Sequence, residues 1–137
     1  MGVGVTVRGH WCFMRGVGRR VFVADMRVIY HKNNWPWGQQ TIIVIASGRA
    51  MCSVSVENDD YSVAYLHNII VHPSIRRRGY GRELLTLAQR RARLMKCTKL
   101  VLWADPNDWP FEWYKRNGFV VCDKRDDGLV NMEKELQ

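Results

Sequence analysis

The second half of the chain alternates between apolar runs with strand character and one long amphipathic segment. Three runs rich in β-branched residues, separated by polar turns, predict a hairpin and a third strand at residues 41–47, 49–56 and 61–72. Pro73 should end the third strand, because proline cannot continue a ladder of backbone hydrogen bonds. Residues 79–96 carry apolar side chains at helical spacing and arginines at other positions, which predicts an amphipathic helix.

The C-terminal pattern predicts a strand at residues 99–104, a short helix and a closing hairpin. Asn107 or Asp108 should cap the helix, with Pro110 in its first turn and Gly118 at its end. The hairpin should comprise residues 119–124 and 129–136. The resulting order of elements predicts an α/β fold, with a mixed β-sheet flanked by helices and a parallel crossover over residues 65–103. Because no repeat or linker interrupts the chain, we expect residues 1–137 to form a single domain.

The first forty residues are less regular. Val3 to Arg8 alternate as in a strand. Residues 19–31 have apolar side chains at helical spacing, which favours a helix, although a strand across Val21–Val23 also fits. Residues 33–38 combine asparagine, tryptophan, proline and glycine, which predicts an aromatic loop that contains Trp35 and Trp37.

Composition narrows the classes of partner. The net charge of +8 favours an acidic partner, such as nucleic acid, an acidic protein face or a phosphorylated cofactor, although solubility alone would also account for it. The four cysteines are scattered without a zinc-binding pattern, so we expect no metal, and reduced thiols in a cytoplasmic protein. No apolar run approaches the roughly 20 residues of a membrane span.

The segment Arg76–Gly81 lies between a predicted strand and a predicted helix and has the chemistry of an anion site. A helix N-terminus has unpaired N–H groups and a partial positive charge. Gly79 and Gly81 would let a phosphate approach the backbone, and three arginines add full charges. A solvated basic turn is the alternative interpretation.

Two motifs resemble those of the Gcn5-related N-acetyltransferase (GNAT) family. VHPSIRRRGYGRELL, residues 71–85, is similar to the family's acetyl-CoA motif, R/Q-x-x-G-x-G/A after a strand that ends in V-x-P. Tyr114–Phe119 resembles the family's Y-x-x-x-G-F, with Asn107 seven residues earlier. The resemblance covers residues 41–137 and implies the mixed sheet of that family and acetyl-CoA as the co-substrate.

The resemblance also implies cofactor-binding positions. The amides of the loop Arg76, Arg77, Arg78, Gly79, Tyr80 and Gly81 would hold the pyrophosphate of coenzyme A. The backbone of Ile69, Ile70 and Val71 would bond the pantetheine arm. Asn107 would contact the cofactor, although it is equally suited to cap a helix.

Catalytic positions follow from the same resemblance. Tyr114 would be the general acid that protonates the leaving thiolate, and the alternative is a core aromatic that pairs with Phe111. Residues 65–71 resemble the Y-L-E-D-I-Y-V run of diamine acetyltransferases, with His67 in place of the glutamate. His67 would then be the general base, or a structural histidine. Trp35 and Trp37 would shape the acceptor pocket, or belong to the core.

We therefore expect an N-acetyltransferase that transfers acetyl from acetyl-CoA to a primary amine. The acceptor stays open: a protein N-terminus, a lysine, a small amine or an aminoacylated RNA. The alternatives are a non-catalytic module that binds acyl-CoA or nucleic acid, and a subunit that completes its site with another chain. The oligomeric state is likewise open, and a dimer is one alternative.

Overall fold

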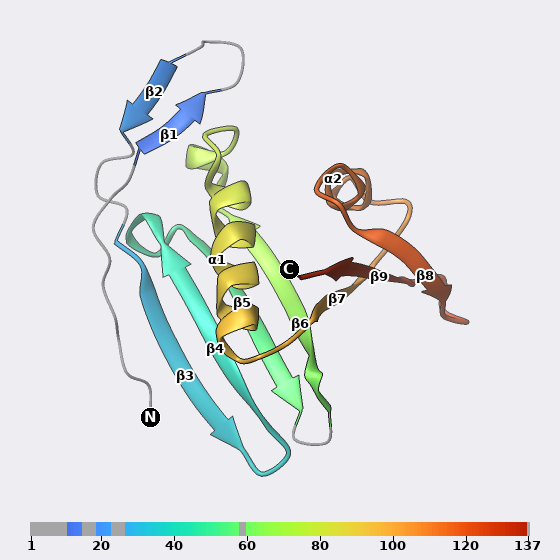
Figure 1. Ribbon diagram of the computed structural model, residues 1–137. Coiled ribbons are helices and arrows are strands. Elements are labelled where there is room, and N and C mark those ends of the chain that lie inside the picture. The colour runs from blue at the N-terminus through green and yellow to red at the C-terminus, as the bar shows by residue number, and fades with distance from the viewer. Residues whose placement is uncertain (1–10, 15–18, 23–26, 58–59, 137) are drawn as a thin grey trace.

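The computed structural model of the chain describes residues 11–14, 19–22, 27–57 and 60–136 (Figure 1). Its elements are, in chain order, β1 Trp11–Met14, β2 Arg19–Phe22, β3 Ile29–Trp35, β4 Gly38–Ile45, β5 Ala50–Glu57, β6 Asp60–Val71, α1 Tyr80–Leu94, β7 Lys99–Ala104, α2 Pro110–Arg116, β8 Val120–Lys124 and β9 Val130–Glu135. In the described part of the chain, a seven-stranded sheet has the order β3-β4-β5-β6-β7-β9-β8, and β1 and β2 pair as a separate hairpin.

The predicted fold class is confirmed. All neighbouring strands of the large sheet are antiparallel except β6 and β7, which pair in parallel across α1. This single parallel pair makes the sheet mixed, as the strand–helix–strand pattern of residues 65–103 predicts. The predicted strand at 99–104 and the helix within 79–96 are also confirmed.

The helix predicted over residues 19–31 is wrong where the structure describes it. Residues 19–22 form β2, which agrees with the alternative strand at Val21 and Phe22, and Ile29–His31 belong to β3. β3 pairs with β4 over its whole length, from Ile29 opposite Val44 to Trp35 opposite Gly38. The predicted loop at 33–38 is therefore shorter than expected, with Pro36 and Trp37 as the turn. The predicted strand at Val3–Arg8 lies outside the described residues.

The predicted cap of α2 is also wrong. Trp109 occupies the N-cap position and makes no side-chain cap hydrogen bond. The Asp105 carboxylate instead accepts a hydrogen bond from the Asn107 backbone N–H, at 2.9 Å. Pro110 does begin the helix, as predicted, because its missing N–H would have had no helical partner.

Helix α1 lies across one face of β4, β5 and β6 (Figure 1). Its buried side chains are Leu84, Leu85, Leu87, Ala88 and Ala92. They pack on the strand positions that alternate toward the helix, which include Ile43, Cys52 and Val54, all fully buried. Burial raises the pKa of the Cys52 thiol to about 12, so this cysteine stays a neutral core residue.

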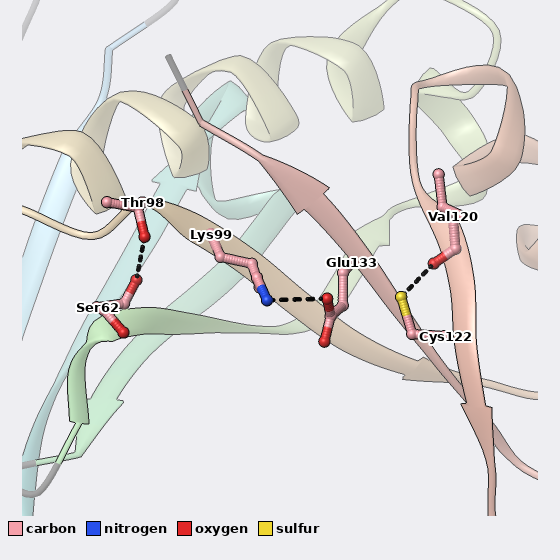
Figure 2. Close-up of polar contacts among 6 residues, drawn as sticks. All are labelled: Ser62, Thr98, Lys99, Val120, Cys122 and Glu133. Atoms are coloured by element: carbon pink, nitrogen blue, oxygen red, sulfur yellow. Dashed lines mark hydrogen bonds and ion pairs between the residues drawn. The ribbon is translucent and has the colours of Figure 1, made fainter.

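Strands β6 and β7 are held together at one end. The Ser62 carbonyl accepts hydrogen bonds from the backbone N–H and the hydroxyl of Thr98, at 2.8 and 3.3 Å. Next to this clamp, the Lys99 ammonium and the Glu133 carboxylate join β7 to β9 at 3.1 Å (Figure 2). The ion pair is partly exposed and adds little stability by itself. The clamp therefore fixes where β7 begins to follow β6.

The buried face of α1 can be tested with two leucines of the same helix. Leu84→Ala should lower the free energy of unfolding by about 2–5 kcal/mol, because it leaves a cavity against the sheet. Leu94→Ala should change it by less than about 0.5 kcal/mol, since Leu94 is 67% exposed. Urea denaturation monitored by circular dichroism measures both variants, and equal losses would contradict the assigned packing.

Candidate functional site

A cleft opens where β6 and β7 stop pairing. The two strands pair only from Val63 opposite Lys99 to Tyr65 opposite Val101. Beyond this point they separate and enclose a cleft of about 310 Å³. β6 contributes Leu66, Asn68, Ile69 and Ile70; β7 and the loop after it contribute Leu102, Trp103, Ala104, Asp105 and Asp108; α2 contributes Pro110, Phe111 and Tyr114. Backbone groups on the inner edge of β6 thus face an open site without a neighbouring strand.

A β-bulge directs β6 away from β7. Ser53 lies opposite His67 and Met51 opposite Ile70, so β6 has one more residue than β5 in this stretch. Asn68 within the bulge has φ +49°, a left-handed conformation that asparagine adopts more easily than most residues. The bulge bends the strand and determines which of its side chains enter the cleft.

Two residues with positive φ shape the backbone of the loop 76–81. Arg77 and Gly79 both have positive φ, at +63° and +87°. Alternation of left-handed and right-handed residues turns successive N–H groups toward one point. Gly79 is the N-cap of α1, and the first helical hydrogen bond runs from the Glu83 N–H to the Gly79 carbonyl, at 3.0 Å. The N–H groups of the first turn are therefore directed outward from the helix.

Arg76 differs from the other two arginines of this loop. Its Nε donates a hydrogen bond of 3.0 Å to the carbonyl of Val71, at the end of β6. This bond holds the loop against the strand. The preceding turn is held by His72, whose Nδ1 accepts from the Ser74 backbone N–H at 3.1 Å. Arg77 and Arg78 are exposed beside the loop.

Helices α1 and α2 meet beside the cleft. A side chain placed at Gly81 would lie 3.6 Å from the ring of Trp113, so the first turn of α1 packs closely on α2. The Trp113 ring also contacts the Tyr114 ring edge-on, with centroids 5.4 Å apart. The contact connects the anion loop to the helix that carries Tyr114.

Tyr114 lines the cleft and also packs on the core. Its ring meets Phe119 edge-on at 5.6 Å, and it is half-buried. Tyr114 therefore packs as a core aromatic, with ring contacts to Trp113 and Phe119 where the sequence predicted Phe111. Its role as the general acid stays a prediction. Burial, followed by the nearby Cys52 thiol, raises the pKa of the Tyr114 phenol above its ordinary value of 10.0. The phenol is a neutral proton donor over the whole physiological range.

His67 forms a hydrogen bond across the sheet. Its Nε2 lies 2.8 Å from the hydroxyl of Ser55 on β5. Ser55 is only 7% exposed, whereas the His67 residue is exposed overall. The serine side of the ring is nevertheless shielded, and burial lowers the pKa of His67 below its ordinary value of 6.5. At neutral pH the imidazole is therefore uncharged.

Of the predicted site residues, Ile69, Ile70 and Tyr114 line the cleft. The others, which are outside its lining, are Trp35, Trp37, His67, Val71, the loop 76–81 and Asn107. Asn107 is exposed and contributes only its backbone N–H to the bond with Asp105. Trp35 and Trp37 stack at the turn between β3 and β4, with centroids 6.1 Å apart. In the sheet register, this turn is four residues along β4 from the level of His67 and two strands away, about 13 Å along the strand.

Sequence reasoning missed Ser55 and Trp113. Ser55 follows from no local motif, because its partner His67 is on another strand. Trp113 could have been predicted near the site, because it directly precedes Tyr114 in the sequence. A larger hollow, about 480 Å³, lies at the exposed turn 123–127 and includes none of the predicted site residues.

Among the described residues, no group of three or more His, Cys, Asp or Glu side chains is arranged to hold a metal ion. None of the helices in this part of the chain is both long and apolar enough to cross a membrane.

Known proteins resemble the chain in sequence pattern and fold. A profile of the acetyltransferase (GNAT) family matches residues 24–119. Nourseothricin acetyltransferase superposes with a TM-score of 0.59 at 22% identity, over 100% of this chain and 89% of that one. The ribosomal-protein-S18-alanine N-acetyltransferase from Escherichia coli has a TM-score of 0.59 at 20% identity, over 76% of this chain and 72% of that one.

A third similar structure is the PaiA N-acetyltransferase from Thermoplasma acidophilum in complex with coenzyme A. Its TM-score is 0.59 at 19% identity, over 70% of this chain and 59% of that one. At these identities the structural similarities establish the fold. No curated protein matches the sequence.

The lowered pKa of His67 predicts how the stability depends on pH. NMR titration of the His67 imidazole should give a pKa below 6.5. The unfolded chain binds this proton more readily, so the free energy of unfolding should fall as the pH drops from about 6.5 toward the folded pKa. Above that window His67 contributes no pH dependence. His67→Gln should remove this part of the profile, and a titration midpoint above 6.5 would contradict the burial.

Proposed function

This chain belongs to the acetyltransferase (GNAT) family, and on that premise we propose that it transfers an acetyl group from acetyl-CoA to a primary amine. One observation carries the proposal: Tyr114 lines a cleft between two separated parallel strands, and β6, which forms one wall of that cleft, continues along the chain to the anion loop at residues 76–81. A phosphorylated thioester could therefore be bound at one end of the site and react at the other. We treat residues 1–137 as one catalytic unit.

Coenzyme A would be held mainly by backbone groups. The N–H groups of residues 76–81 suit the pyrophosphate, because positive φ at Arg77 and Gly79 turns them toward one anion. Arg77 and Arg78 add charge, and Arg76 positions the loop through the Val71 carbonyl. The inner edge of Ile69–Val71 would pair with the amides of the pantetheine arm much as an added strand would. The coenzyme A complex of the similar PaiA enzyme supports this choice of co-substrate.

The reaction requires two proton transfers. The amine nitrogen attacks the thioester carbonyl carbon, the C–N bond forms, and the C–S bond then breaks. The amine loses a proton to a base, and the departing sulfur takes one from an acid. Tyr114 is the acid of this proposal, because its phenol lines the cleft and stays protonated. Asn107 would contact the cofactor near the mouth of the cleft.

His67 is the base of this proposal. When the Ser55 hydroxyl accepts the Nε2–H, the imidazole keeps its basic lone pair at Nδ1. The serine would thus position the ring and select its tautomer. The lowered pKa keeps the ring neutral, as a base must be before reaction. An acceptor large enough to extend along β4 would also meet Trp35 and Trp37.

Cofactor binding can be tested with two variants that change the charge equally. Calorimetric titration of the protein with acetyl-CoA should give saturable binding. Arg78→Glu should weaken it at least about tenfold, because it replaces a charge that assists phosphate binding with a repulsive one. Lys124→Glu on exposed β8 should bind as the wild type does. Absent binding by folded wild-type protein, or equal losses in both variants, would overturn the proposed cofactor site.

The catalytic role of Tyr114 predicts a loss of rate without a loss of binding. Tyr114→Phe should reduce kcat on the order of 100-fold and leave the Kd for acetyl-CoA unchanged. Tyr30→Phe is the matched control, since burial also raises the pKa of Tyr30 but this residue packs beneath α1. Thiol release with a panel of primary amines measures both. A Tyr114→Phe enzyme with wild-type kcat would exclude the phenol as the acid.

A further inference from the structure

The positive charge of the chain is concentrated in one segment. Residues 76–96 contain seven arginines, one lysine and one glutamate, a net of +7 out of +8 for the whole chain. Outside this segment, basic and acidic side chains nearly cancel. The excess positive charge is therefore concentrated in the anion loop, in α1 and at Lys96 just beyond it.

The basic side chains of α1 form a stripe on its outer side. At 100° per residue, Arg82, Arg90 and Arg93 fall within about 80° of the circumference of α1. Lys96 follows just after the helix ends at Leu94, with φ +67°. All four are exposed, whereas the buried leucines and alanines occupy the opposite side. We call these four residues the basic stripe. It extends about 21 Å from the first turn of the helix to just beyond its last.

Coenzyme A would account for only one end of this stripe. Its pyrophosphate would bind at residues 76–81, and Arg90 lies about 12 Å further along the axis from Arg82. Arginines three and four residues apart repel one another, so this face destabilises the isolated helix. A partner that supplies several negative charges in a row would remove this repulsion.

We propose that the basic stripe binds the phosphate backbone of a nucleic acid. Arginine outnumbers lysine seven to one in residues 76–96, and its planar fork fits phosphate oxygens with two hydrogen bonds. A lipid surface is a poorer match, because Leu94 is the one large apolar side chain of α1 that the structure exposes.

The stacked tryptophans at the β3–β4 turn support a single-stranded ligand. Arg91 Nε donates to the Thr41 hydroxyl at 3.0 Å, which connects the C-terminal half of α1 to the middle of β4 in that hairpin. Trp37 is four residues before Thr41 and is 65% exposed. In the sheet register Trp35 is on the face opposite Thr41 and α1. A strand that follows the basic stripe past the C-terminal end of α1 would therefore have to pass the hairpin turn before unpaired bases could stack on the exposed Trp37.

The experiment uses fluorescence anisotropy of the full chain with labelled oligonucleotides of about 20 nucleotides, long enough to span the stripe. Single-stranded RNA, single-stranded DNA of the same sequence and a duplex are the three probes. A poly-glutamate peptide is the competitor that represents an acidic protein. We expect saturable binding of the single strands that weakens steeply between about 50 and 200 mM salt.

The test variant combines Arg90→Gln and Arg93→Gln. The control combines Lys115→Gln and Arg116→Gln, which removes the same charge from helix α2. For the test variant, the slope of log Kobs against log salt should be smaller by about 1.4, the value for two lost phosphate contacts on a single strand. The control should keep the wild-type slope. Thermal melts establish whether each variant is folded. If the test variant is unfolded, a variant that combines Arg82→Gln and Lys96→Gln takes its place.

The proposal would be overturned if the folded wild type bound no probe, or if the test and control variants had equal effects, because the basic stripe would then not be the binding surface. Full displacement of RNA by acetyl-CoA would also overturn it, because binding would then be restricted to the cofactor loop. Competition by poly-glutamate as strong as by RNA would overturn it in favour of an acidic protein. Each readout is independent of catalysis, so failure of the acetyltransferase proposal would leave this test intact.

Discussion

The short pairing between β6 and β7 is the constraint on which the rest of the site depends. Three opposed residue pairs and the Ser62–Thr98 clamp hold the strands together at one end, and the bulge at Asn68 bends β6 away at the other. Backbone groups that a full-length sheet would have paired are left facing a cleft. Since unpaired backbone groups are costly unless they meet water or a ligand, the separation leaves a place for an extended, amide-containing molecule.

Helix α1 combines three roles that compete for its surface. Leu84, Ala88 and Ala92 are fully buried against the sheet. The N-terminal turn presents backbone N–H groups, and its N-cap Gly79 has φ +87°, a conformation that favours glycine. The outer side carries like charges that repel one another by a few tenths of a kcal/mol per pair. Burial of the three leucines Leu84, Leu85 and Leu87, worth about 1.5–3 kcal/mol each, offsets this repulsion and stabilises the helix despite its basic outer side.

The sequence predicted features with a local signature and missed those that depend on distant pairing. Glycines and arginines between a strand and a helix predict an anion loop, because loop and helix are continuous in the chain. The helix expected over residues 19–31 failed because spacings of three and four also occur in strands, and the pairing of Ile29 with Val44 decided between them. The Ser55–His67 hydrogen bond joins residues on two strands, so no local pattern predicts it. The expected cap of α2 at Asn107 was wrong because the turn before the helix places Trp109 at the N-cap position.

The two anion sites proposed for α1 would differ in their response to salt. The cofactor loop would act through backbone N–H groups at short range, in a turn shaped by Arg77 and Gly79. The basic stripe acts through exposed guanidinium groups, whose attraction is screened within about 8 Å at physiological ionic strength. Arg90 and Arg93 lie further than this from the loop along the helix axis. Two anions on one helix would therefore repel each other only weakly, and occupancy of the loop would leave the stripe available.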